Sequence, residues 1–206
     1  MKRTALACTL IGLGIGLTTA AAGDTLPVTE DAVFTFQGQE ITISRVSTVD
    51  TATLTALTQI SCAAPCLSPM AVADDVQTLG ELDVIEFLST QVETGDGLLI
   101  DARMPDARAL GFIPASVNVP TATVSPNNPF RNEILMALGA EQFEGIFEFS
   151  GALSLVVYDG GPATQDAPTL ISDLLAAGYP PEKIAYYRGG MQVWTTLGLS
   201  TVTASQ

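Results

Sequence analysis

An alternation of short apolar stretches with helical patterns begins at Thr78 and constrains the fold more than any other feature of the sequence. Leu98–Ile100, Leu153–Tyr158 and Ile184–Tyr187 are apolar runs that predict buried strands. Strands that alternate with helices are typical of a largely parallel sheet covered on both faces. The sequence therefore predicts an α/β domain with a central, mostly parallel sheet flanked by helices.

The helices between these strands are predicted from their start and stop signals. A capping box at Thr78–Glu81 begins the first helix, whose buried face is expected at Leu82, Ile85, Leu88 and Val92. The remaining predicted helices are Asn128–Leu138, which Gly139 ends, Asp166–Ala177, which Gly178 ends, and a short last helix that contains Trp194.

The first 22 residues have the pattern of a secretory signal peptide. Lys2 and Arg3 precede the uncharged apolar run Ala5–Thr18, and Ala20 and Ala22 provide small residues for cleavage before Gly23. An uncleaved anchor is the alternative, but a membrane span needs about 20 apolar residues and this run is shorter. We expect a periplasmic or secreted protein without stable membrane insertion after cleavage.

Charge and composition exclude several classes of function. The chain has 8 basic and 22 acidic side chains, a net charge of −14, so nucleic acid is not an expected partner. Loss of Lys2 and Arg3 with the signal peptide makes the mature chain more acidic still. The sequence contains no histidine, which excludes Ser-His-Asp and Cys-His catalysis and histidine-ligated zinc. We expect no metal site and no cofactor.

Residues 23–77 form a predicted N-terminal extension of the domain at 78–203. Ala32–Val46 alternates apolar and polar residues around Gln37-Gly38, which predicts a β-hairpin, and an irregular segment follows. Cys62 and Cys66 remain after removal of Cys8, and in an oxidising compartment they most simply form a disulfide. A redox-active or sulfur-accepting thiol pair is the open alternative.

The predicted chemistry centres on a loop between the strand Leu153–Tyr158 and the helix that follows it. In an open α/β sheet, ligands bind beyond the carboxyl ends of the strands. Successive backbone N–H groups of a glycine-rich loop could form an anion-binding nest there, although a plain tight turn is the simpler interpretation. The loop residues are Asp159, Gly160, Gly161, Pro162, Ala163, Thr164 and Gln165.

The order of motifs resembles the rhodanese-like sulfurtransferases over about residues 78–202. Leu99-Ile-Asp-Ala-Arg103 is similar to a strand followed by D-x-R in that family. The segment Gly111-Phe-Ile-Pro-Ala-Ser-Val-Asn-Val-Pro120 is similar to G-H-I-P-G-A-x-N-x-P. Tyr187-Arg-Gly-Gly-Met-Gln-Val-Trp194 is similar to the closing L-x-G-G-x-x-x-W signature. The resemblance implies a rhodanese-like fold, with Leu155–Tyr158 as the strand that leads to the catalytic cysteine.

This chain departs from the family pattern at the residues that carry the chemistry. The resemblance places Asp159 where rhodaneses have the cysteine that accepts sulfane sulfur, and Thr164 where some exported members have a second cysteine. Phe112 replaces a histidine and Ala115 a glycine, and the loop lacks an arginine. A carboxylate cannot form a persulfide, and Asp159 could itself occupy the nest. We therefore expect a silent domain that acts as a binding or regulatory module, with a periplasmic protein or a small anion at the loop as its partner.

Two enzymatic alternatives remain open. Cys62 or Cys66 could supply the missing thiol if one of them lies reduced beside the loop. Alternatively, Asp159 could act as a nucleophile toward phosphate, with Mg²⁺ held by Asp101 and Asp166. Asp166 is more simply read as the cap of the helix that begins there.

The remaining candidates are interpreted mainly as structural. By resemblance, Asp101, Arg103 and Arg188 brace the active loop, and Arg188 could pair with Asp159. Tyr186, Tyr187 and Trp194 are expected in the core. Phe143, Phe147 and Phe149 could form an exposed aromatic patch for a partner, although core packing is expected for at least two of them.

Overall fold

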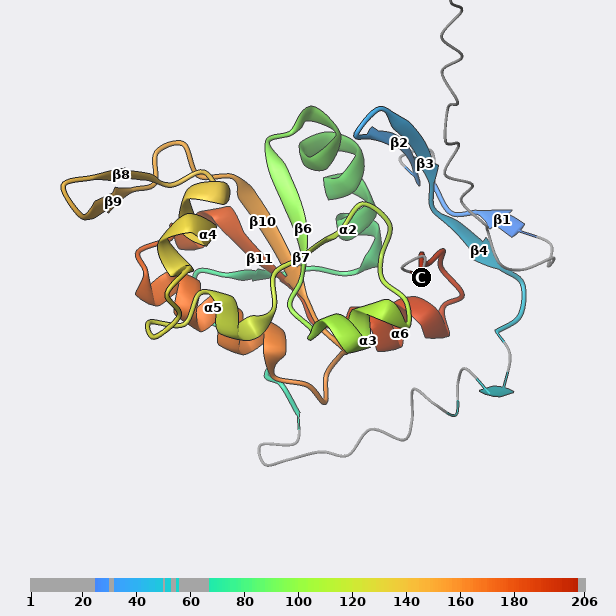
Figure 1. Ribbon diagram of the computed structural model, residues 1–206. Coiled ribbons are helices and arrows are strands. Elements are labelled where there is room, and N and C mark those ends of the chain that lie inside the picture. The colour runs from blue at the N-terminus through green and yellow to red at the C-terminus, as the bar shows by residue number, and fades with distance from the viewer. Residues whose placement is uncertain (1–24, 30–31, 50, 53–54, 56–66, 204–206) are drawn as a thin grey trace, which may run out of the picture.

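A five-stranded parallel sheet forms the centre of the computed structural model, which describes residues 25–29, 32–49, 51–52, 55 and 67–203 (Figure 1). The strand order is β5-β11-β10-β6-β7, and every neighbouring pair is parallel. The bounds are β5 Gln77–Thr78, β6 Gly97–Asp101, β7 Val117–Asn118, β10 Ser154–Tyr158 and β11 Ile184–Tyr187. The predicted α/β fold with a central parallel sheet is confirmed.

Helices cover both faces of this sheet (Figure 1). On one face lie α2 (Glu81–Phe87), its continuation as one π-helical turn (Leu88–Val92) and α6 (Gly190–Thr196). On the other lie α4 (Arg131–Ala137) and α5 (Asp166–Ala176). Alternate residues of β10 enter the two cores: Leu155 and Val157 face α5, whereas Val156 and Tyr158 face α2 and α6. Both faces of β10 are thus apolar, which explains why its sequence is an uninterrupted apolar run.

The first two predicted helices, which correspond to α2 and α4, begin at other residues than predicted. Asp83 Oδ2 accepts a hydrogen bond from the N–H of Gly80, so the capping pair of α2 is Gly80 and Asp83, not Thr78 and Glu81. Leu82 is 60% exposed, and Val84 takes its predicted place in the core. Helix α4 begins three residues late, because Asn128 Oδ1 instead accepts from the N–H of Phe130 in a turn.

The described part of the N-terminal extension packs against the end of the domain. β2 (Val33–Phe36) and β3 (Gln39–Thr42) form the predicted hairpin, with Gln37 and Gly38 at positive φ. β1 (Thr25–Pro27) pairs with β4 (Ser44–Val46), which forms a bridge from Arg45 to Leu199. Phe34 and Ile43 join the same core as Trp194.

Several short elements of the domain were not predicted. They are α3 (Pro105–Ala109), a 3-10 turn at Thr121–Thr123, another at Pro181–Lys183, and a hairpin of β8 (Glu141–Phe143) and β9 (Ile146–Glu148). Figure 1 shows this hairpin extending from the body beside α4.

Some predictions concern residues outside the described part of the chain. They are the signal peptide at 1–22 and the pairing of Cys62 with Cys66. Among the described residues, no helix is both long and apolar enough to cross a membrane.

Candidate functional site

The loop Asp159–Gln165 leaves the carboxyl end of β10 and leads into α5. β10 lies between β6 and β11, and Tyr158 is level with Asp101 on β6 and Tyr187 on β11. The loop therefore begins over the middle of the sheet, where α/β proteins place their ligands. This is the position that the sequence predicted.

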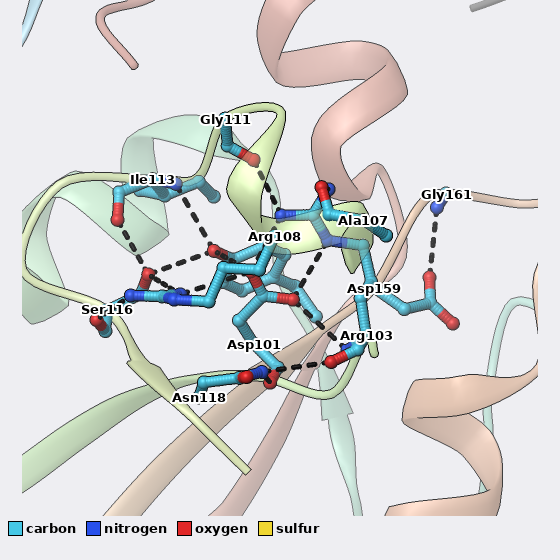
Figure 2. Close-up of polar contacts among 11 residues, drawn as sticks. Asp101, Arg103, Ala107, Arg108, Gly111, Ile113, Ser116, Asn118, Asp159 and Gly161 are labelled. Carbon is cyan, nitrogen blue, oxygen red and sulfur yellow. Dashed lines mark hydrogen bonds and ion pairs between the residues drawn. The ribbon is translucent and has the colours of Figure 1, made fainter. Parts of the chain in front are cut away.

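The carboxylate of Asp159 lies inside its own loop. The residue is fully buried, and its Oδ1 lies 2.9 Å from the backbone nitrogen of Gly161 (Figure 2). Its Oδ2 lies 3.0 Å from the backbone nitrogen of Ala167. Both N–H groups donate to it, and the second belongs to the first turn of α5, where a helix favours negative charge. The side chain of Asp159 thus occupies the donors that a bound anion would use.

Thr164 closes the loop further. Its hydroxyl donates to the carbonyl of Gly161 at 2.8 Å and lies 3.0 Å from the nitrogen of the same residue. A Cβ at Gly160 would lie 2.9 Å from the methyl group of Thr164. The two glycines and Thr164 are therefore packed into a tight turn with internally satisfied polar groups.

Asp166 does not cap α5, in contrast to the prediction. Gln165 precedes the helix, and its side chain makes no capping hydrogen bond. Asp159 accepts the N–H of Ala167 and so performs the capping role from seven residues before the helix. Asp166 is the first residue of α5. Its pKa is raised, mainly by burial and next by the negative charge of Asp159.

Ser68, a residue of the N-terminal extension, covers the loop Asp159–Gln165. This contact was not predicted from the sequence. Its N–H donates to the carbonyl of Pro162 and its hydroxyl to the carbonyl of Thr164, both at 2.7 Å. Gln165 Nε2 donates to the Ser68 hydroxyl at 2.9 Å. Ser68 is 2% exposed. Contacts between residues about 96 positions apart leave no local pattern, so sequence reasoning had no signal for this one.

Arg188 braces the loop indirectly and does not pair with Asp159. Its Nε and Nη2 donate to the carbonyl of Ser68 at 3.1 and 3.0 Å. Among the described residues, no ion pair joins Arg188 to a carboxylate. The arginine therefore holds the segment that covers the loop, and the possible pairing with Asp159 was wrong.

Asp101 and Arg103 brace a neighbouring segment rather than the loop itself (Figure 2). Arg103 donates to both carboxylate oxygens of Asp101, at 2.9 and 2.7 Å, and to the carbonyls of Ala107 and Gly111. Arg108 adds a third guanidinium contact to Asp101 at 3.1 Å. These bonds fix residues 101–111, and none of them reaches the loop 159–165.

Phe112 and Ala115 occupy well-defined places in the adjoining turn. The guanidinium of Arg108 lies 3.7 Å from the centre of the Phe112 ring, an attractive cation–π contact. Ala115 has φ 62°, a left-handed conformation that glycine adopts more readily.

The three phenylalanines of the predicted aromatic patch divide as expected: Phe147 and Phe149 pack on the core, and Phe143 is 75% exposed. Tyr186, Tyr187 and Trp194 are fully buried.

Nothing in this geometry supports a metal-assisted phosphoryl-transfer site. Both oxygens of Asp159 are bonded to backbone N–H groups, and Asp101 is engaged by two arginines. In the part of the chain that the structure describes, no three acidic or cysteine side chains converge in a way that could hold a metal ion.

The sequence matches the profile of the rhodanese-like domain over residues 85–197, more than half of the chain. The chain belongs to the rhodanese-like domain family. A search of curated proteins finds no match. Solved structures of similar proteins have low sequence identity to it.

Three of these structures show how much of each chain the matches cover. A thiosulfate sulfurtransferase from Pseudomonas aeruginosa is 21% identical (TM-score 0.43), and the match covers 64% of this chain and 21% of that one. An As-Sb reductase from Leishmania major is 22% identical (TM-score 0.43; 59% and 79% covered). A human single-domain sulfurtransferase is 19% identical (TM-score 0.39; 60% and 96% covered). This rhodanese-like chain thus spans about a fifth of the first protein and nearly all of the last.

The buried carboxylate of Asp159 should make the stability of this rhodanese-like domain depend on pH. Burial raises the pKa of Asp159 above its ordinary value, although hydrogen bonds from Ala167, Thr164 and Gly161 oppose the shift. A raised acid pKa means that the folded state binds a proton more tightly. The free energy of unfolding contributed by Asp159 should then fall as pH rises from about 4 through the raised pKa, and stay constant above it.

Urea unfolding of the wild type and of Asp159→Asn across this pH range measures the effect. Asp166 titrates in both proteins, so the wild-type free energy minus that of the variant isolates the contribution that depends on Asp159. We expect the difference to decrease with rising pH. A difference that increases with pH would contradict the direction of the shift.

Proposed function

We propose that this protein is an exported rhodanese-like domain that does not transfer sulfur and acts as a binding or regulatory module. The observation that carries the proposal is the buried carboxylate of Asp159, held by the N–H groups of Gly161 and Ala167. The pattern of the first 22 residues supports export.

The proposal rests first on the chemistry of the missing nucleophile. By resemblance, Asp159 stands where rhodaneses have the cysteine that becomes a persulfide. A carboxylate oxygen cannot carry sulfane sulfur, so a covalent relay through this position has no intermediate. Loss of the nucleophile therefore abolishes the step rather than slowing it.

The closed loop also argues against a small anion as the partner. An anionic donor such as thiosulfate would need free backbone N–H groups, and Asp159 already uses those of Gly161 and Ala167. It would approach a protein of net charge −14 whose loop contains no lysine or arginine. Ser68 bonds to two loop carbonyls from outside. A protein partner is therefore favoured over an anion.

One observation favours the alternative of a relocated thiol. Ser68 bonds to the loop, and Cys66 precedes Ser68 by only two residues. The alternative is a sulfurtransferase in which Cys62 or Cys66 carries the sulfur.

Formation of thiocyanate from thiosulfate and cyanide distinguishes the two functions. The assay uses the protein recovered after export, first as isolated and then after reduction and removal of the reductant. We expect no thiocyanate above the rate without protein in either state. An active single-domain rhodanese assayed in parallel shows that the conditions support the reaction.

Each other outcome has a defined meaning. Activity only after reduction would overturn the silent domain, and Cys62→Ser and Cys66→Ser would then show which thiol carries the sulfur. Activity in both states would also overturn it. The intact mass of the recovered protein tests export separately: a chain beginning at Gly23 is expected, and one beginning at Met1 would contradict export.

A further inference from the structure

The hairpin of β8 and β9 exposes an apolar pair at its tip. Phe143 is 75% and Ile146 74% exposed, and the two residues are directly opposite each other across the hairpin. Glu144 and Gly145 form the tight turn between them, both at positive φ. An adjacent Phe and Ile that are both exposed cost solvation free energy, which burial against a partner would recover.

Two glutamates lie on the same face of this hairpin. Glu141 is opposite Glu148, and each is two residues from the apolar pair, so all four side chains project to one side. Like charges directly opposite each other destabilise a strand pair. Glu148 is partly engaged, because it accepts the N–H groups of Phe149 and Ser150. Glu141 has no hydrogen-bond or ion-pair partner among the described residues.

The other face of the hairpin is anchored. Phe147 packs against the core, and its ring lies 6.1 Å from that of Phe149, which in turn lies 5.3 Å from the ring of Tyr179. The tip is therefore held in place while the face with Phe143 and Glu141 remains exposed. In the described structure the hairpin is a sheet of two strands, so each strand has an edge that pairs with no other strand.

We propose that the edge of β8 is a docking site for an extended segment of a partner protein that alternates apolar and basic side chains. The added strand places an apolar side chain beside Phe143 and a lysine or arginine, two residues away, beside Glu141. Main-chain hydrogen bonds to the edge provide affinity, and the two side chains provide specificity. The site is independent of whether the loop at Asp159 is silent.

The negative charge of the hairpin favours a basic partner segment over a second copy of the chain at this site. A second hairpin would bring its own Glu141 and Glu148 against the first pair, between two molecules that are each strongly acidic. A basic segment removes the repulsion between the two glutamates. Binding should therefore weaken as salt is added.

A peptide titration tests the site on the whole chain labelled with ¹⁵N. The probe is the capped peptide Thr-Lys-Thr-Val-Thr-Lys-Thr-Val-Thr, followed through the backbone amide signals of the protein. Two control peptides replace either every Lys by Glu or every Val by Ser. We expect saturable shifts centred on residues 141–148 with the probe, and much weaker binding of both control peptides.

Matched variants test the two halves of the site. Phe143→Ser with Ile146→Thr should weaken binding at least tenfold, and Glu141→Gln about threefold, the scale of one surface ion pair. The control variants are Val33→Ser and Glu40→Gln, which change exposed residues of the same types on the β2–β3 hairpin. They should leave the affinity unchanged.

Several results would overturn the proposal. One is equal binding by wild type and the Phe143→Ser, Ile146→Thr variant. Another is shifts centred elsewhere, such as the hollow of about 560 Å³ between α2 and the amino ends of β10 and β11. Equal binding of the control peptide without Val would show that charge alone drives binding and that the apolar pair contributes nothing. A dimer in sedimentation that the same double variant abolishes would make a second copy the occupant.

Discussion

Replacing Asp101 with alanine should remove a large part of the folding free energy of this domain. Asp101 is fully buried and accepts hydrogen bonds from Arg103, Arg108 and the hydroxyl of Tyr158. Arg103 is itself only 8% exposed, so the substitution leaves a buried guanidinium without its carboxylate. Breaking a buried ion pair from one side costs about 3–5 kcal/mol, against about 5–15 kcal/mol for the stability of a whole domain.

The coupling between the two charges supports this expectation. Burial alone would lower the pKa of Arg103, yet its pKa lies above the ordinary value because the hydrogen bonds and charge of Asp101, together with smaller contributions from Tyr158, more than offset burial. The arginine is therefore stabilised in its charged form by Asp101. Without Asp101, the same burial becomes an uncompensated penalty.

Urea unfolding of Asp101→Ala, with Asp106→Ala as the control, measures this cost. Asp106 is an exposed carboxylate on the neighbouring helix α3, and its loss should change the free energy of unfolding by no more than about 0.5 kcal/mol. A loss below about 1 kcal/mol in Asp101→Ala would show that the network is not needed for stability.

The sheet and the site loop could be predicted because their signals are local. β10 and β11 are apolar on both faces, so their sequences are short apolar runs bounded by polar or turn residues. The glycines of the loop mark the turn from β10 into α5. The sequence therefore placed Asp159 correctly at the end of the central strand.

Some parts could not be predicted because two residues could play the same role, or because the contact joins residues far apart in the sequence. Both Asp159 and Asp166 could cap α5, and only the folded loop shows that Asp159 reaches the N–H of Ala167. Ser68 meets the loop from about 96 residues away. The β8–β9 hairpin was missed because each of its strands is three residues long and contains a glutamate, which strands disfavour.

Replacing Gly190 with alanine should both destabilise the domain and displace the site loop. Gly190 has φ 54°, and a Cβ there would lie 2.5 Å from the carbonyl oxygen of Asp159 and 2.6 Å from the nitrogen of Gly161. The first turn of α6 is bonded to the same loop, since the N–H groups of Met191 and Gln192 donate to the carbonyls of Asp159 and Gly160. A methyl group would force α6 and the loop apart and break these bonds.

The size of the effect follows from two separate costs, which a second glycine distinguishes. A left-handed conformation costs an alanine about 1–2 kcal/mol, and overpacking adds about 1–3 kcal/mol. Gly145 has φ 84° but no atom within 4 Å of its would-be Cβ, so Gly145→Ala measures the conformational cost alone. Urea unfolding should therefore show a clearly larger loss for Gly190→Ala, with shifted amide signals from residues 159–161. Equal losses in the two variants would mean that α6 and the loop can separate without cost, and that Gly190 serves only the turn.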